Sequence, residues 1–218
     1  MRIAYVILTC EKHTETLMKW QQATCLSKVP REDIYYLGHT MDPDRRVFNW
    51  GAGDLLHQVP EKLVGLFKNA QFHDYDWIVI ADDDTYIFTD RVHRLLSKYK
   101  LEQRLTIGCT HEHEDLFEYN SSGAGVILSK MLYNAVSTVV KTVKNPIIHW
   151  CADICLGSWI QEVHKKNYVK LGSNRHFHND YYDPLKDSLA TAITFHHCKE
   201  KEKYDELYLY EYTNNVIN

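Results

Sequence analysis

Hydrophobic residues recur along the chain in short blocks of two kinds that alternate. Blocks of the first kind are almost continuously apolar, which is typical of strands buried on both faces. We expect such strands at 2–9, 34–37, 77–81, 105–109, 126–128 and 168–171. Blocks of the second kind carry apolar residues at helical spacing, and we expect helices at 14–26, from Pro60 onward, after an Asp90 cap, at 129–143 and at 154–163. Strands that alternate with helices predict an α/β protein with a layered sheet.

The polar stretch at 39–53 contains Pro43, Gly51 and Gly53 and is predicted to be a loop. The sequence contains no internal repeat, low-complexity tract or linker rich in proline, glycine and serine. We therefore expect a single domain over residues 1–218, a length that buries most of its apolar surface without metal or disulfide support.

Composition and charge narrow the classes of function. Hydrophobic residues make up 44% of the chain and charged residues 25%, which excludes intrinsic disorder and fibrous repeats. Lysine and arginine together number 25 against 29 acidic residues, giving a net charge of −4. Nucleic-acid-binding modules are usually strongly basic, so we expect no nucleic-acid partner. If the protein binds phosphate, the positive charge must come from a metal or a local pocket.

The apolar runs are too short to span a bilayer, and residues 1–8 lack the cleavage pattern of a signal peptide. The six cysteines are scattered and mostly lie in apolar surroundings, as reduced cysteines do. We expect no membrane span and a cytoplasmic, reducing compartment. The alternatives are a viral or bacterial enzyme in an unusual setting, or one module of a longer chain.

Three adjacent aspartates, Asp82, Asp83 and Asp84, directly follow the expected strand 77–81. Adjacent carboxylates repel one another, and folding does not require them there. Clustered oxygen ligands are what Mg²⁺ and Mn²⁺ prefer, so the run indicates a metal site, with a solvated acidic turn as the alternative. Alternate residues Asp82 and Asp84 can face the same side. Such a pair suits a divalent ion that bridges the phosphates of a nucleotide-sugar diphosphate.

Other residues offer chemistry, each with a plainer alternative. Gly123 and Gly125 permit a close backbone approach just before a strand, or form an ordinary turn. Asp153 stands in apolar surroundings that suit a general base, or it is an acid that favours a helix N-terminus. His196 follows an apolar residue and is either a ligand or a satisfied core histidine.

These residues belong to motifs that together resemble the Fringe and core 1 β1,3-galactosyltransferase family. The motifs occur in the family's order and span residues 3 to about 210. They are Leu-Thr-Cys-Glu-Lys-His at 8–13 with Trp20, Ala-Asp-Asp-Asp-Thr-Tyr at 81–86, Tyr-Asn-Ser-Ser-Gly-Ala-Gly-Val-Ile-Leu-Ser-Lys at 119–130, Asp-Ile-Cys-Leu-Gly at 153–157, Ala-Ile-Thr-Phe-His-His at 192–197 and Tyr-Asp-Glu-Leu-Tyr at 204–208.

The resemblance implies a GT-A fold, which is a Rossmann-like nucleotide-sugar transferase fold with a mixed central sheet flanked by helices. It implies a glycosyltransferase that moves a hexose-type sugar from a UDP-sugar to a hydroxyl of a glycan or glycoprotein. It also implies Mn²⁺ as the cofactor, with Mg²⁺ as the alternative.

The resemblance implies roles around the metal. Asp84 would be the direct ligand and His196 the second protein ligand, while Asp82 and Asp83 would lie by the ribose, the diphosphate and metal-bound water. An imidazole beside oxygen ligands suits Mn²⁺ better than Mg²⁺. His197 has no such support and is expected to be structural.

The resemblance also implies roles around the donor sugar and nucleotide. The segment of Ser122, Gly123, Ala124 and Gly125 would form the wall beside the donor sugar. Thr9 would hold uracil or ribose, with help from Lys12 or His13. The family usually has a glycine where this chain has Ser122, so the fit of the donor sugar is expected to differ.

Asp153 matches the family's general base, and the resemblance implies a single displacement with inversion. The family commonly has an acid before this residue, where this chain has Ala152. A retaining transferase on the same scaffold and a non-catalytic domain that binds nucleotide or glycan are the alternatives. The aromatic stretch 174–182 is either surface or acceptor cleft. The His, Glu and Asp residues at 111–115 are expected to form a mobile, solvated loop, with adventitious metal binding as the alternative.

Overall fold

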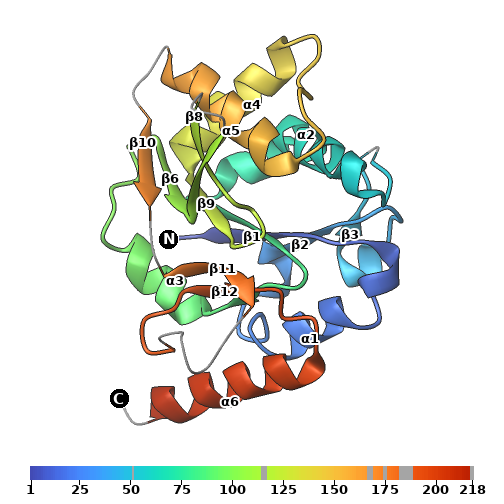
Figure 1. Ribbon diagram of the computed structural model, residues 1–218, viewed down its shortest axis with the longest axis vertical. Helices are drawn as coiled ribbons and strands as arrows, with labels where there is room; N and C mark the ends of the chain where they lie inside the picture. Colours follow the sequence, from blue (N-terminus) through green and yellow to red (C-terminus); the bar gives the residue numbers. More distant parts are fainter. Residues whose placement is uncertain (51, 114–116, 166–168, 174–175, 182–188, 217–218) are drawn as a thin grey trace.

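The computed structural model describes residues 1–50, 52–113, 117–165, 169–173, 176–181 and 189–216. Their main feature is a seven-stranded sheet with the order β10-β6-β9-β4-β1-β2-β3 (Figure 1). Strand β9 is antiparallel to both of its neighbours, and the other pairs are parallel. The strands are β1 (Ile3–Leu8), β2 (Ile34–Leu37), β3 (Val47–Phe48), β4 (Trp77–Asp82), β6 (Leu105–Gly108), β9 (Val126–Ser129) and β10 (Lys170–Ser173).

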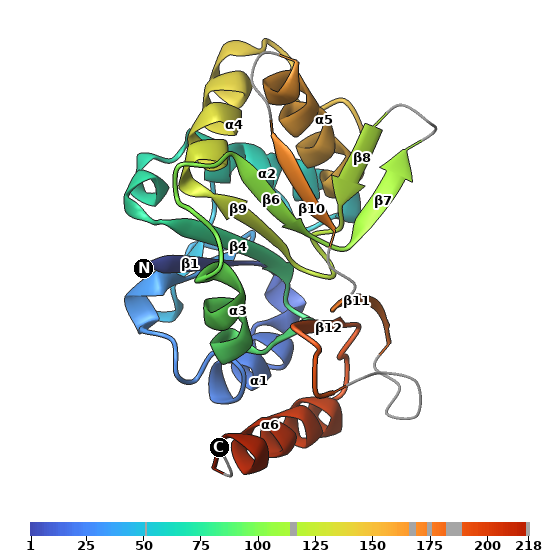
Figure 2. The same cartoon turned by 90° about the vertical axis from the view of Figure 1, so that its left-hand side faces the viewer.

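Helices cover both faces of this sheet, so alternate residues of the central strands enter two separate cores (Figures 1 and 2). In β1, Tyr5 and Ile7 pack into one core, and Ala4 and Val6 pack into the other. The first core lies under α1 (Leu17–Ala23), α3 (Thr89–Leu96) and α6 (Lys201–Val216). The second core lies under α2 (Val59–Lys68), α4 (Lys130–Thr142) and α5 (Ala152–His164).

Two small sheets flank the main one. One holds β5 (Tyr86–Ile87), β12 (Thr194–His196) and β11 (Phe177–Tyr181), and the antiparallel pairing of β12 with β5 returns the late part of the chain to the end of β4. The other is the hairpin of β7 (Thr110–His113) and β8 (Phe117–Asn120), which lies beside α5 (Figure 2).

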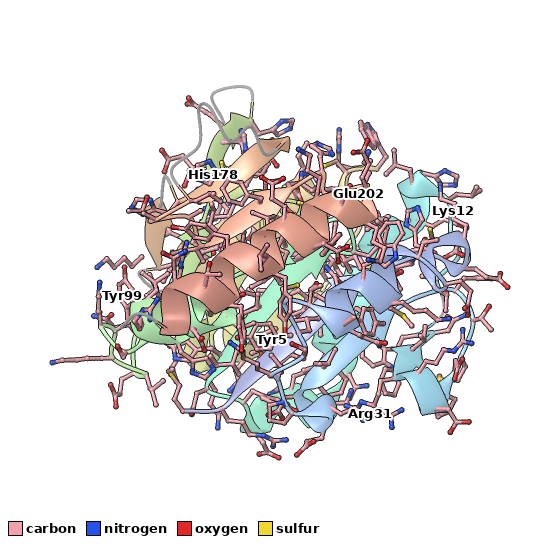
Figure 3. All side chains as sticks on the ribbon, turned by 90° about the horizontal axis from the view of Figure 1, so that it is seen from below. Tyr5, Lys12, Arg31, Tyr99, His178 and Glu202 are labelled. Atoms are coloured by element: carbon pink, nitrogen blue, oxygen red, sulfur yellow. The ribbon has the colours of Figure 1, made fainter. Side chains whose placement is uncertain are left out.

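Short 3₁₀ helices complete the described elements; they lie at Glu11–His13, Arg31–Asp33, Pro43–Arg45, Leu56–Gln58 and Ala70–Asp74. The last helix, α6, runs across the outside of its face, and its Glu202 lies on the same side of the molecule as Lys12 (Figure 3). Among the described residues, no helix combines the length and the apolar character needed to cross a membrane.

The expected strands of the main sheet are present to within about two residues, and the α/β layering is confirmed. The Asp90 cap is wrong, because α3 begins at Thr89 with Phe88 as the N-cap. Asp90 instead lies in the first turn, where its charge favours the helix dipole. The expected loop at 39–53 contains β3, and the helix expected at 14–26 is only Leu17–Ala23 in its α-helical part.

Two elements differ more strongly from the sequence patterns. His111 and His113, expected in a solvated loop, belong to strand β7, which pairs with β8; residues 114–115 lie outside the described part of the chain. Helix α6 was not expected, because its sequence is mostly polar or charged and shows little amphipathic periodicity.

Candidate active site

A cleft of about 430 Å³ opens where β1 and β4 end and β9 begins. Because β9 is antiparallel, its amino end lies at the same edge of the sheet as the carboxyl ends of the parallel strands. Ligands of open α/β sheets bind at this edge. The lining residues come from five stretches of the sequence, and they are 8–10 with 12–13, 54, 56, 59 and 62 in and before α2, 82–84, 121–123 and 150–153.

The turn after β4 is fixed by a buried glutamine. The Nε2 of Gln21 donates to the carbonyl oxygens of Asp82 and Thr85, at 3.1 and 2.8 Å. Gln21 is fully buried on α1, so the acidic turn is attached to the first helix as well as to its own strand. The sequence patterns did not identify Gln21, because a glutamine on a helix is usually exposed. Only its position on the inner face of α1 distinguishes it from a surface residue.

The late part of the chain holds the other two carbonyl groups of this turn. The hydroxyl of Tyr204 on α6 donates to the carbonyl oxygen of Asp83 at 2.8 Å. The backbone N–H of Cys198 donates to the carbonyl oxygen of Asp84 at 2.7 Å. With all its carbonyls bonded, the turn presents its three carboxylates in fixed directions.

The three carboxylates point in two directions, as the alternation of strand residues suggests. Asp83 is buried and faces β1, where its Oδ2 accepts from the Oγ1 of Thr9 at 2.6 Å and lies 2.9 Å from the Nδ1 of His13. Asp82 and Asp84 face the opposite direction, toward His196. Thr9, which is expected to bind the nucleotide, therefore lines the cleft, and its hydroxyl already donates a hydrogen bond to a carboxylate.

His196 is brought to the acidic turn by the pairing of β12 with β5. Its Nε2 lies 3.1 Å from the Oδ1 of Asp84 and 3.7 Å from the Oδ2 of Asp82. Its Nδ1 lies 3.3 Å from the carbonyl oxygen of Asn179, which can only accept a hydrogen bond. Nδ1 therefore carries a proton, and a second proton on Nε2 lets the ring donate to Asp84. A bound cation would replace that second proton, and a histidine whose other nitrogen donates to a carbonyl oxygen is a typical metal ligand.

His197, which sequence reasoning treated as structural, lies with the same carboxylate. Its Nδ1 is 3.6 Å from the Oδ2 of Asp84, and its ring stacks on that of His196 with centroids 3.8 Å apart. Consecutive strand residues normally face opposite sides, but His197 has a φ of 58° and turns back toward Asp84. Ligand atoms of these three residues all lie within 4.8 Å of one another.

The two glycines before β9 have different structural roles, and Gly123 makes room for His196. A Cβ on Gly123 would lie 2.4 Å from the Cε1 of His196, so a side chain there would displace the imidazole. Gly125 has a φ of +89°, which L side chains rarely adopt. The carbonyl oxygen of Gly123 accepts from the Oγ1 of Thr85 at 2.6 Å, and that of Ala124 accepts from the Oγ1 of Thr194. Of the expected wall, Ser122 and Gly123 line the cleft, whereas Ala124 is fully buried and neither it nor Gly125 lines the cleft.

Ser122 connects this wall to Asp153. The backbone N–H of Ser122 donates to the Oδ1 of Asp153 at 3.0 Å, and its hydroxyl contacts the same oxygen. Asp153 lies in the first turn of α5, next to the buried Ala152. Both bonds end on Oδ1, so Oδ2 is the oxygen available to another group. The serine that departs from the family pattern thus positions the expected base.

A buried lysine adds a positive charge that the sequence patterns did not identify. The side chain of Lys62 on α2 is 4% exposed, and its Nζ donates to the carbonyl oxygen of Thr9 at 2.6 Å and contacts the Oδ1 of Asp54 at 3.2 Å. A lysine on the apolar side of a helix is the pattern that could have indicated this site, because an ammonium group is costly to bury without partners.

The cleft is lined by more carboxylate groups than lysine side chains, so its negative charge is not balanced. Desolvation, followed by the charge of Asp153, raises the pKa of Asp82 well above its usual range. Burial would also raise the pKa of Asp84, but His196 outweighs it and holds that pKa below its usual value. Burial lowers and Asp84 raises the pKa of His196, with a net increase. A divalent cation would relieve this excess negative charge, and the oxygen and imidazole donors fit one.

The chain is similar in sequence to one family model and to a galactosyltransferase. A family model described as Fringe-like matches residues 56–211, which is more than half of the chain. Glycoprotein-N-acetylgalactosamine 3-beta-galactosyltransferase 1 of Xenopus laevis is 28% identical over 98 residues, covering 44% of this chain. The chain matches only 27% of the length of that relative.

Solved structures share the fold at low sequence identity. The galactosyltransferase LgtC, crystallised with donor and acceptor sugar analogues, has a TM-score of 0.51 and 13% identity, with 95% of each chain covered. The apo form of the glycosyltransferase GlyE from Streptococcus pneumoniae has a TM-score of 0.56 and 10% identity, covering all of this chain and 64% of that one. The expected GT-A fold is therefore confirmed.

The support of the acidic turn by Gln21 can be tested through stability. Gln21→Leu leaves the carbonyl oxygens of Asp82 and Thr85 buried without a donor, so we expect a loss of about 2 kcal/mol in the free energy of unfolding, measured with urea. Gln71→Leu, at an exposed position, is the control and should stay within about 0.5 kcal/mol of the wild type. Equal stability of the two variants would show that the glutamine does not hold the turn.

Proposed function

The chain belongs to the Fringe-like family, and from that premise we propose that it transfers a hexose from a UDP-sugar to a hydroxyl of a glycan or glycoprotein in a divalent-metal-dependent reaction. The observation that carries the proposal is that Asp84 and Asp153 line one cleft and that His196 contacts Asp84 there. Each comes from a different part of the sequence, and each offers a different part of the chemistry that sugar transfer needs.

Asp84 and His196 are the residues that would hold the metal, with Asp82 beside them and His197 within reach. The imidazole nitrogen favours Mn²⁺ over Mg²⁺. When bound, the ion would neutralise the donor diphosphate and stabilise the departing nucleotide. Asp84 and His196 fix each other's orientation, which prepares both ligands for an ion.

The remaining cleft residues suit the donor. The carbonyl oxygen and the hydroxyl of Thr9 are held by Lys62 and Asp83, so the end of β1 forms a rigid floor for the nucleoside. The buried Lys62 adds the positive charge that an acidic protein needs near an anionic donor. Ser122 and Gly123 would then lie beside the donor sugar.

Asp153 is the group proposed to act as general base. Ser122 holds its Oδ1, and its Oδ2 would take the proton of the acceptor hydroxyl. The acceptor oxygen forms a bond to the anomeric carbon as the bond from that carbon to the diphosphate oxygen breaks, and the electron pair of that bond leaves with UDP. A single displacement of this kind inverts the anomeric configuration.

Removing the base tests this assignment. Asp153→Asn keeps the shape and the acceptor oxygen for the Ser122 bonds but cannot take a proton at its nitrogen. We expect the rate of sugar transfer, measured as UDP release with a panel of UDP-hexoses and Mn²⁺, to fall about 100-fold or more. Asp74→Asn, at an exposed site, should transfer as the wild type does. Full activity of Asp153→Asn would show that Asp153 is not the base. If the NMR spectrum of the product shows that the anomeric configuration of the donor is kept, the mechanism is retaining and not inverting.

The metal site has a test that does not need activity. Asp84→Asn and His196→Ala each remove a proposed ligand, so we expect the affinity for Mn²⁺, measured from the electron paramagnetic resonance of the free ion, to fall about 10-fold or more. His93→Ala, at an exposed position on α3, is the matched control and should bind Mn²⁺ unchanged. Unaltered Mn²⁺ binding in both ligand variants would contradict the proposed site.

A further inference from the structure

Four aromatic rings form a continuous row from the β7–β8 hairpin to the start of α5. The ring centroids of Phe117 and His113 are 5.5 Å apart, those of His113 and His149 5.8 Å, and those of His149 and Trp150 5.3 Å. We call these four residues the aromatic row. The chemistry described so far uses none of them.

The row ends in the cleft. Trp150 lines the cleft, as do Cys151, Ala152 and Asp153 directly after it in the chain. Its side chain is 57% exposed, which is unusual for an indole and leaves a large apolar surface in water. An exposed tryptophan that lines the same cleft as a candidate base is placed to contact the molecule whose proton that base removes.

The row is held rigidly to the helix that carries Asp153. The backbone N–H of Cys151 donates to the Nδ1 of His149 at 3.0 Å, and the thiol of Cys155 donates to the carbonyl oxygen of His149 at 3.1 Å. These bonds fix the His149 ring and backbone against the first turns of α5. The row and the candidate base therefore keep a constant relation to each other.

The hairpin end of the row is fixed to the same helix. Strand β8 packs on α5 so closely that a Cβ on Gly157 would lie 2.6 Å from the Cβ of Tyr119 and 2.8 Å from the Cε2 of Phe117. The hairpin is thus seated on α5, as Figure 2 shows. A preorganised surface of this kind loses little conformational entropy when a ligand binds.

We propose that the aromatic row is the acceptor subsite and that it binds the pyranose rings of an oligosaccharide. The accepting sugar lies on Trp150, and the following sugars extend over His149 and His113. This inference rests on the proposed function and specifies its acceptor as a glycan of more than one sugar.

The chemistry of the row favours a neutral glycan over other ligands. The C–H faces of pyranose rings stack on aromatic faces, and the ring nitrogens of the histidines can bond to hydroxyl groups at the edges of the sugars. At the other end of the row, Trp150 lines the cleft that also contains Asp82 and Asp153, so an anionic chain would meet negative charge there. A peptide acceptor would make fewer stacking contacts with the row, because a peptide lacks a repeating apolar face.

The test uses glycan binding apart from catalysis. The probe is a glycan array of mono- to pentasaccharides, incubated with the full chain in the presence of Mn²⁺ and UDP. We expect Trp150→Ala to weaken array binding about tenfold or more, because stacking on the indole is lost, and Trp150→Phe to retain most of it. The control is Ile148→Ala, which is similarly exposed at 62% but lines a different hollow beside Pro146 and Trp159. It should bind as the wild type does.

A second variant tests the extent of the subsite. We expect His113→Ala to bind monosaccharides as the wild type does and to lose the preference for trisaccharides, because only longer acceptors reach this ring. Wild-type glycan binding by Trp150→Ala would overturn the proposal, as would binding of peptides in place of glycans or of no array glycan at all.

Nucleotide binding separates this inference from the proposed function. If every variant binds UDP with Mn²⁺ and Trp150→Ala still binds glycans normally, the row assignment alone fails. If the wild type binds no UDP but its glycan binding depends on Trp150, the row stands and the transferase proposal fails.

Discussion

The contact between Asp84 and His196 is the interaction on which the site depends. Three adjacent aspartates at the end of a buried strand would repel one another and favour protonation or a disordered turn. The imidazole at 3.1 Å from Asp84 offsets part of that repulsion and gives the carboxylate a fixed direction. The pairing of β12 with β5 provides this contact, and the bonds from Cys198 and Tyr204 to the turn backbone reinforce it.

The antiparallel strand β9 extends this arrangement to the other side of the cleft. Its reversed direction places Ser122 and Gly123 at the edge where β4 ends. Gly123 admits the ring of His196, and Ser122 bonds to Asp153. One short segment therefore positions both the candidate metal ligand and the candidate base. A displacement of this segment would move both His196 and Asp153.

Much of this could be predicted because it depends on short-range patterns. Continuous apolar runs marked the main strands, and the repulsion of clustered charges marked Asp82 and Asp84. The parts that could not be predicted depend on distant contacts. The role of Gln21 and Lys62 follows from which carbonyl groups lie opposite them, and the proximity of His197 to Asp84 follows from one backbone angle. Helix α6 lacked a clear apolar stripe, and the pairing that makes β7 a strand is set by β8.

The most direct measurement is a calorimetric titration of UDP, GDP and CMP into the protein, performed with Mn²⁺ and repeated with EDTA. We expect UDP to bind in preference to GDP and CMP and EDTA to abolish this binding, because the diphosphate would meet an acidic cleft without its cation. Absence of nucleotide binding under both conditions would contradict the transferase account. It would leave a fold of this family whose cleft serves another ligand.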